Sequence, residues 1–348
     1  MEKSIRNINI LLFIGYNLII IVILFFGLEL VYRFQLIDTY RAELHSYNIK
    51  DDLLDHKDRK TILIMGDSYT VGNDSYTKLL QERLKNYRII NSGISGTGII
   101  QASIIAPKRF REFNPRIFIY QVYVGSDLFD IRYSLNWENI GLIRNLYWFV
   151  SNHLRFISFL NYRVAQIIEE EQATNGVNGG IQKLETISVT NNNSRDSGLD
   201  YTDRVKIYLS AEPYLVDDSI MVKNNRIQDF QIFLNKLEEL IDLSRHARCK
   251  AVILIIPHCC QLNDIYLNKF KYIGAKFTDP ARVQDNEYPF IAALRKKYSG
   301  ESNVTVLNPL ERLRQAENIK HVYYQNDDHL TPFGQSIIAD FVIEQLQL

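Results

Sequence analysis

Short apolar segments alternate with longer helical patterns along this chain, and the alternation constrains the fold more than any other feature. The expected strands are 61–65, 87–91, 117–124, 250–256 and 304–308. The expected helices are 75–85, 97–111, 225–247 and 332–347. Strands joined through helices pair in parallel and are covered on both faces. The sequence therefore predicts an α/β fold, a flavodoxin-like three-layer sandwich around a parallel sheet of about five strands.

Residues 8–32 form a largely apolar run near the N-terminus. At 1.5 Å per residue, about 24 helical residues extend roughly 36 Å, which is enough to cross a bilayer. No small-residue cleavage site follows, so we expect an uncleaved transmembrane anchor rather than a removed signal peptide. Lys3 and Arg6 precede the run, which favours a cytoplasmic N-terminus at 1–7 and a domain outside the cytoplasm.

The expected domain order after the anchor is a charged juxtamembrane linker at 33–59 and one large domain at 60–348. Of the 348 residues, 46% are hydrophobic, which is ample for one core. The formal net charge of zero argues against nucleic acid as the principal partner. The adjacent Cys259 and Cys260 bridge badly with each other or with Cys249, and no metal-ligand spacing is present. We expect no disulfide, metal or cofactor.

Two polar motifs lie far apart in the chain. Gly66-Asp67-Ser68 follows the first expected strand, and Asp327-Asp328-His329 lies near the C-terminus. A serine hydroxyl attacks an acyl carbon only when an imidazole takes its proton and a carboxylate orients that imidazole. The two motifs together supply these three groups.

Two further glycine-containing segments follow strands. Asn91 to Gly98 comes after the second expected strand, and Gly125-Ser126-Asp127 after the third. With these four blocks in order, the chain resembles the SGNH (GDSL-type) hydrolase superfamily over roughly 60–130 and 250–348. The resemblance says nothing about the segment between, where we expect an insertion at about 131–223.

The resemblance implies a role for each matched position. Ser68 matches the nucleophile and His329 the base, and the main-chain amides of Ser68 and Gly96 would receive the oxyanion. Asp327, two residues before His329, matches the acid in the Asp-x-His spacing of membrane-linked glycan O-acetylation relatives. Asn326 is a neutral alternative orienter.

Ser126 departs from the family pattern, because it stands where the superfamily usually has the asparagine that contributes to the oxyanion hole. A hydroxyl is a shorter donor than an amide, and losing one such donor commonly costs about 10²- to 10³-fold in rate. The departure leaves open an active site that works slowly, a site in which the Ser126 hydroxyl or a water takes the place of the amide, or a catalytically weak scaffold.

Each of these candidate site residues also has a purely structural interpretation. Ser68 could be a turn residue and Ser126 a loop residue. Gly93, Gly96 and Gly98 could be loop glycines with positive φ, which is the favoured interpretation for Gly93 and Gly98. Asp67 is expected to hold its turn by accepting from nearby amides. His258 could line the site, although a loop histidine is the default.

The middle of the chain carries fewer signals. Residues 140–169 predict a helical run rich in large apolar side chains, either packed in the core or facing a membrane or substrate chain. Residues 173–199 are rich in Asn, Gly and Ser and predict a loop.

The expected function is a membrane-anchored serine esterase or acyltransferase that forms an acyl-serine intermediate. The favoured substrate is an O-acetyl group on a cell-envelope glycan, with other cell-envelope acyl-transfer proteins as further partners. A lipid or lysophospholipid esterase is the alternative enzyme, and a catalytically weak glycan-binding scaffold is the alternative outside catalysis.

Overall fold

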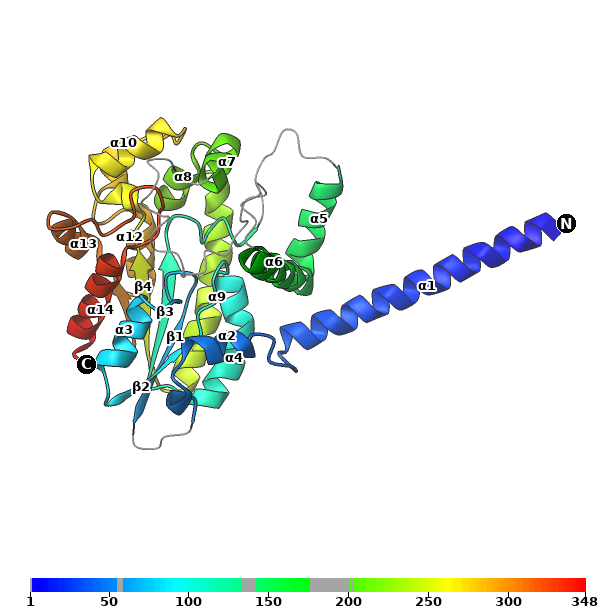
Figure 1. Ribbon diagram of the computed structural model, residues 1–348, viewed down its shortest axis with the longest axis horizontal. Helices are drawn as coiled ribbons and strands as arrows, with labels where there is room; N and C mark the ends of the chain where they lie inside the picture. Colours follow the sequence, from blue (N-terminus) through cyan, green and yellow to red (C-terminus); the bar gives the residue numbers. More distant parts are fainter. Residues whose placement is uncertain (1, 55–58, 133–141, 176–200, 202) are drawn as a thin grey trace.

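The computed structural model describes residues 2–54, 59–132, 142–175, 201 and 203–348. Its centre is a five-stranded parallel sheet in the order β2-β1-β3-β4-β5 (Figure 1). The strands are β1 Lys60–Met65, β2 Tyr87–Asn91, β3 Ile117–Tyr123, β4 Lys250–Ile256 and β5 Val304–Leu307. The predicted α/β fold is confirmed, and every expected strand matches an observed one to within a residue at each end.

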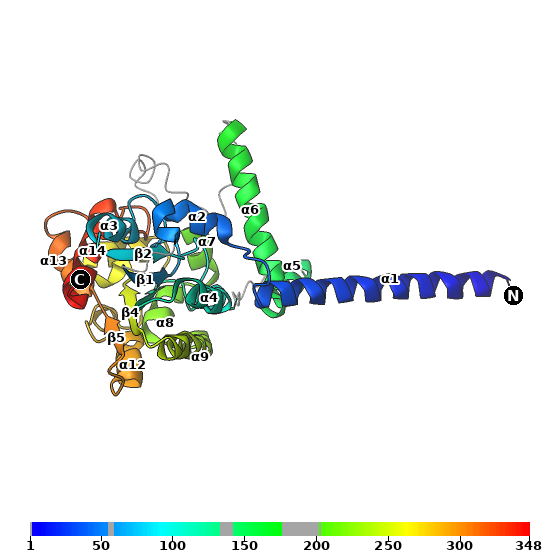
Figure 2. The same ribbon diagram turned by 90° about the horizontal axis from the view of Figure 1, so that it is seen from below.

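Helices cover both faces of the sheet, as Figure 2 shows from below. One face carries α3 Tyr76–Arg83, α13 Leu310–Glu317 and α14 Pro332–Leu346. The other carries α4 Ile99–Phe113, α9 Asn225–His246 and α12 Pro289–Tyr298. Shorter elements complete the domain: η2 Cys259–Gln261, α10 Asp264–Tyr272 and α11 Pro280–Val283.

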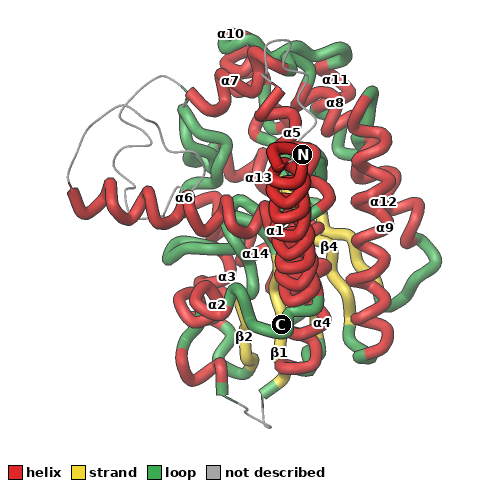
Figure 3. Tube along the Cα trace, turned by 90° about the vertical axis from the view of Figure 1, so that its right-hand side faces the viewer, coloured by secondary structure: helices red, strands yellow, loops and turns green. Residues whose placement is uncertain are grey.

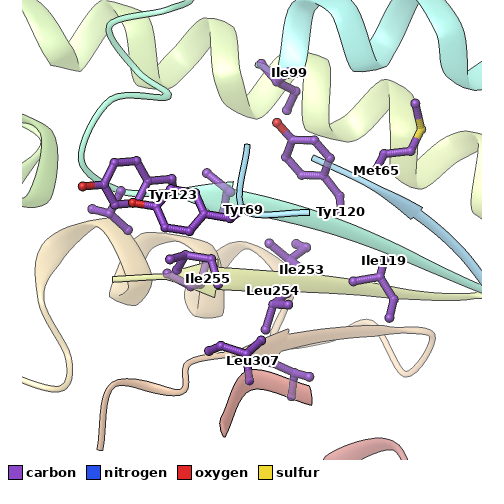
Figure 4. Close-up of a cluster of buried hydrophobic side chains, with 14 of the residues drawn as sticks. Met65, Tyr69, Ile99, Ile119, Tyr120, Tyr123, Ile253, Leu254, Ile255 and Leu307 are labelled. Carbon is purple, nitrogen blue, oxygen red and sulfur yellow. The ribbon is translucent and has the colours of Figure 1, made fainter. Parts of the chain in front are cut away.

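The strands are buried because both faces are covered. Every residue of β1, β3 and β4 after the first is buried. Their aliphatic and aromatic side chains fill the space between sheet and helices, as Figure 4 shows for Met65, Ile119, Tyr120, Ile253 and Leu254. This continuous apolar character is typical of central strands in parallel sheets.

The strand order creates a switch point between β1 and β3. The chain leaves β1 for β2 at one edge, then returns past β1 to β3 and continues to β5. At such a point the connections diverge and leave a crevice outside the carboxyl ends of the strands. The segments that begin at Gly66 and Val124 border this crevice from the ends of β1 and β3.

The N-terminal helix α1, Glu2–Arg33, projects away from the domain (Figure 1). Its segment Leu12–Arg33 is long and apolar enough to cross a membrane, and almost none of it is buried. The segment after it is not an extended tether. It contains α2 Arg41–Tyr47 and η1 Lys50–Leu53, and the side chain of Asn48 donates to the carbonyl of Asn91 at 2.7 Å.

The helical run expected at 140–169 is two helices in the described part, α5 Leu142–His153 and α6 Arg155–Asn175. The predicted helical run is confirmed in this part, except for a break at Leu154, where side chains of α1 bond both helix ends. Arg33 donates to the carbonyl of His153, and Glu29 accepts from the amides of Arg155 and Phe156. Beyond them lie α7 Asp203–Ala211 and α8 Leu215–Met221. Residues 140–141, and most of the loop expected at 173–199, lie outside the described residues.

The start of α14 fixes the loop that precedes it. Thr331 caps the helix, since its Oγ1 accepts from the Gly334 amide at 3.1 Å, and Pro332 occupies the first turn. Gly334 is pressed against the preceding loop: a Cβ there would lie 2.2 Å from the carbonyl oxygen of Val322. Only glycine allows the helix and the loop to approach this closely.

We predict that Gly334→Ala destabilises the protein even though alanine is the better helix former. The new methyl group meets main chain that cannot move aside, so the expected loss is about 1–3 kcal/mol of unfolding free energy. Denaturant unfolding of the detergent-solubilised full chain, followed by circular dichroism, measures it. Gly300→Ala is the matched control, because a Cβ at Gly300 meets nothing within 4 Å. Equal midpoints for the two variants would contradict the close approach.

Candidate active site

The turn after β1 holds Ser68 at the edge of the sheet. Asp67 Oδ1 accepts from the Tyr69 amide at 2.8 Å, and the Asp67 carbonyl accepts from the Thr70 amide at 3.1 Å. The turn is also tied to β2, since the Asn91 side chain donates to the Thr70 carbonyl at 2.7 Å. The prediction that Asp67 holds this turn is confirmed.

Ser68, His329 and Asp327 form a chain of hydrogen bonds. Ser68 Oγ lies 2.9 Å from His329 Nε2, and His329 Nδ1 lies 2.5 Å from Asp327 Oδ1. The same carboxylate oxygen accepts from the His329 amide at 2.9 Å. With the ring proton on Nδ1, the arrangement leaves Nε2 as the acceptor for the serine hydroxyl.

The two neighbours of Asp327 have different surroundings. The Oδ1 of Asn326 is buried and accepts no hydrogen bond within the described chain. Asp328 Oδ1 lies 3.7 Å from His329 Nδ1, beyond hydrogen-bonding distance. Asp327 is therefore the carboxylate that bonds the ring in this geometry.

Two tyrosines that the sequence did not single out hold the histidine loop. Tyr69 donates to the carbonyl oxygen of Asp328 at 2.6 Å, and Tyr123, the last residue of β3, donates to Asp328 Oδ2 at 2.8 Å. Burial raises the pKa of both phenols well above the usual value, so both keep the proton that they donate. Tyr69 also stacks on the His329 ring with centroids 5.0 Å apart. Figure 4 shows Tyr69 and Tyr123 side by side.

Main-chain donors are available beside the serine. Within the described chain, the amides of Ser68 and Gly96 donate to no protein group. Gly96 has φ of +65°, a left-handed conformation that favours glycine. Ser126 lines the same pocket as both residues. These three positions supply donors of the kind that stabilise an oxyanion.

A pair of buried carboxyl groups lies behind the serine turn. The carboxyl groups of Asp67 and Asp127 are close enough for each to shift the pKa of the other. Burial raises the pKa of Asp67 to about 6. Burial, followed by the neighbouring Asp67, raises the pKa of Asp127 well above its usual range. Two carboxyl groups in one buried place do not both ionise readily, so the pair retains a proton near neutral pH.

The serine opens into a pocket of about 110 Å³. Its floor is polar and includes Ser68, Ser126 and His329. Its apolar wall comes from three helices, α7, α8 and α10, through Val205, Leu209, Leu215, Val216 and Phe270. No sequence signal pointed to this wall, because α7 and α8 belong to the segment that no motif covers.

His258 lies in the pocket wall rather than on an outer loop. Its side chain is buried, and its Nδ1 accepts from the Cys260 amide at 3.2 Å. Phe270 packs against the ring edge to face, with centroids 4.6 Å apart. From the sequence, a loop histidine was the default expectation and a histidine that lines the site was the alternative; the structure has the alternative.

Two groups of side chains in the described chain lie close enough to hold a metal ion, His258-Cys259-Cys260 and Asp327-Asp328-His329. Burial raises the pKa of the Cys259 thiol well above its usual value, which disfavours the thiolate that a metal needs. In the second group, His329 and Asp328 are already engaged by Ser68 and Tyr123. We assign a metal to neither.

No model of a known protein family matches the chain. No curated protein matches it either. Among solved structures, a GDSL-like lipase from Bacteroides thetaiotaomicron is similar at 11% identity, covering 89% of this chain and 96% of that chain, with a TM-score of 0.39. TesA is similar at 12% identity, 83% and 98% coverage and a TM-score of 0.37. An acetyl xylan esterase is similar at 14% identity, 82% and 99% coverage and a TM-score of 0.36. At these identities and scores, the argument for function rests on the site itself.

We predict that Asp327→Asn lowers ester turnover by about 10³- to 10⁴-fold, because an amide cannot stabilise the imidazolium or fix the ring tautomer. Asp328→Asn is the matched control, since its side-chain oxygen can still accept from Tyr123. It should cause a far smaller loss. Steady-state hydrolysis of an acetyl ester by both variants measures the difference, and equal losses would contradict the assignment of Asp327.

Proposed function

We propose that this protein is a serine esterase or acyltransferase of the SGNH type that works through an acyl-serine intermediate. The observation that carries the proposal is the unbroken chain from Ser68 Oγ through His329 to Asp327, at 2.9 and 2.5 Å, on the floor of a pocket. A nucleophile, a base and an orienting carboxylate in this order are what acyl transfer requires.

The proposed reaction has two halves. Ser68 Oγ attacks the ester carbonyl while its proton moves to His329 Nε2, and the carbonyl oxygen becomes an oxyanion facing the amides of Ser68 and Gly96. The intermediate collapses, the C–O bond to the alcohol breaks, and His329 returns the proton to the leaving oxygen. Water, or the hydroxyl of an acceptor, then attacks the acyl-serine while its proton moves to His329 Nε2. The acyl C–O bond to Ser68 breaks, and His329 returns the proton to Ser68 Oγ, which restores the free serine.

Ser126 is the proposed third member of the oxyanion site. Its hydroxyl donates one hydrogen bond where an asparagine amide would offer two N–H groups. The two main-chain amides remain, so we expect an active enzyme rather than the glycan-binding scaffold that the sequence left as an alternative.

The size of the pocket favours a short acyl group. At about 110 Å³ the pocket is well below the roughly 300–1,000 Å³ typical of sites for drug-sized ligands. An acetyl group would fit against the apolar wall. We propose an O-acetyl group on a cell-envelope glycan as the substrate, supported by this size, by the apolar helix α1 and by the family that the motifs resemble.

The proposed location is a membrane, with α1 as a single-pass anchor and the domain outside the cytoplasm. The length and exposure of Leu12–Arg33 support the anchor. Lys3 and Arg6 ahead of the span support a cytoplasmic N-terminus.

A lipid or lysophospholipid esterase is the second candidate, because one whole wall of the pocket is apolar. If α7 and α8 part, a longer acyl chain could lie along Val205, Leu209 and Val216. The two candidates differ in the acyl length that the enzyme prefers.

We predict that the detergent-solubilised full chain hydrolyses nitrophenyl acetate faster than the butyrate and octanoate esters. Ser68→Ala should lower turnover by at least about 10³-fold. The matched control is Ser103→Ala, which removes a hydroxyl of α4 whose one hydrogen bond among the described residues goes to the Ile100 carbonyl of its own helix. Preference for octanoate would favour the lipid esterase. Turnover that survives Ser68→Ala would overturn the proposed function.

A further inference from the structure

Large apolar side chains are exposed around the base of α1, where this helix meets the domain. Leu146 and Phe149 of α5 are 60% and 62% exposed and lie one turn apart on the same face. Leu160, Val164 and Ile167 of α6 are exposed at a spacing of four and three residues, which forms one stripe along the helix. Exposed apolar residues also follow α1 directly: Phe34, Leu36 and Ile37. We call these eight residues the apolar collar.

The last turn of α1 is bonded to α5 and α6 and so holds the apolar collar at the end of the apolar span. The Glu29 carboxylate is almost buried and accepts from the amides of Arg155 and Phe156 at 3.1 and 2.7 Å, so it caps the first turn of α6. Arg33 pairs with Glu29 and donates to the carbonyl of His153 at the end of α5 at 2.9 Å. The corner between α5 and α6 is therefore bonded to the residues at which the apolar span ends.

The neighbouring face of α6, next to this stripe, is packed against the protein. Phe159 stacks on Tyr32 at a centroid distance of 5.3 Å and meets the edge of Tyr40 at 5.5 Å. Arg163 pairs with Glu43 of α2 at 2.6 Å. Because α6 is held on this side by aromatic and ionic contacts, the stripe of Leu160, Val164 and Ile167 is presented outward in a fixed orientation.

Helix α6 runs across the axis of α1, and α5 is inclined to it. In Figure 2, α6 stands across α1, and in Figure 1, α5 rises at an oblique angle beside the base of α1. Figure 3 looks along α1 from its N-terminus and shows α6 extending sideways from the base of α1. A membrane crossed by α1 would have its surface along α6, with α5 inclined to that surface.

We propose that the α5–α6 hairpin lies in the surface of the same bilayer that α1 crosses, with the apolar collar inserted among the lipid headgroups. The inference rests on the membrane anchoring given under the proposed function and goes beyond it. Helices with an apolar face commonly bury that face about 5–10 Å deep at the boundary of headgroups and acyl chains. The apolar collar begins where the apolar span of α1 ends. We therefore expect the lipids of the same membrane to cover the collar.

The hairpin would hold the domain in one orientation rather than on a free tether. The strands of the sheet run across the α1 axis in Figure 1. With the hairpin seated, the carboxyl ends of the strands, and the pocket beyond them, would face along the membrane surface. A substrate would then approach from the side, in the layer next to the membrane.

The test places an environment-sensitive bimane label at single introduced cysteines in the full chain. The three native cysteines are buried, so the labels react selectively at Leu146→Cys and Val164→Cys. Ile319→Cys is the matched control: its native side chain is 83% exposed, and the residue lies just after α13, which is on the side of the domain away from α1. Ile21→Cys in the middle of the span reports on the anchor. The protein is reconstituted in vesicles of equal parts phosphatidylcholine and phosphatidylglycerol, with and without nitroxide-bearing lipid.

We predict that the lipid nitroxide quenches the labels at 146, 164 and 21 several-fold more than the label at 319. The same three labels should be shielded from aqueous iodide. If the labels at 146 and 164 behave like that at 319 while the label at 21 is quenched, the hairpin inference is wrong and the anchor stands. Shielding from iodide without quenching by lipid would show that protein covers the collar, and would also overturn the inference. An unquenched label at 21 would refute the anchor and the inference together.

Discussion

The hydrogen bond between Ser68 and His329 joins two segments 261 residues apart, and the chemistry proposed for the protein depends on it. Neither segment can hold its side chain in place alone. Ser68 is set by the turn after β1 and by the link from Asn91 in the neighbouring strand. His329 is set by Asp327, by the stacked ring of Tyr69 and by the capped start of α14. The parallel sheet brings these parts together, because all its strands end at the same edge.

Residues other than Ser68, His329 and Asp327 also hold the site in place at this edge of the sheet. Tyr69 and Tyr123 bind Asp328 from two different strand ends and so couple the histidine loop to β1 and β3. Gly334 allows the last helix to press against the loop at Val322. At the base of α1, Glu29 and Arg33 join the apolar helix to α5 and α6. Both at the histidine loop and at the base of α1, a few side-chain contacts hold a segment of the protein in position.

Much of this arrangement could be predicted from the sequence. The strands stand out because each is a short apolar run, and the order of the motifs places Ser68, Gly96, Ser126 and His329 at strand ends or in the final loop. The resemblance to relatives with an Asp-x-His motif pointed to Asp327 as the residue that contacts the ring, with Asn326 as the alternative. The break between α5 and α6 could not be predicted, because the groups that cap it belong to α1, more than a hundred residues earlier. Nor could the apolar pocket wall or the tyrosine contacts to Asp328, since each depends on tertiary packing that leaves no periodic pattern.

The most direct test of the central claim is the site of covalent modification by a fluorophosphonate. The full chain is incubated with the reagent, digested and analysed by peptide mass spectrometry. A serine that reacts as proposed should carry the phosphonyl group at Ser68, and His329→Ala should abolish the labelling because the base is lost. Ser95 and Ser126 line the same pocket and serve as internal comparisons. Labelling at either of them instead of Ser68, or labelling of Ser68 that persists in His329→Ala, would contradict the account.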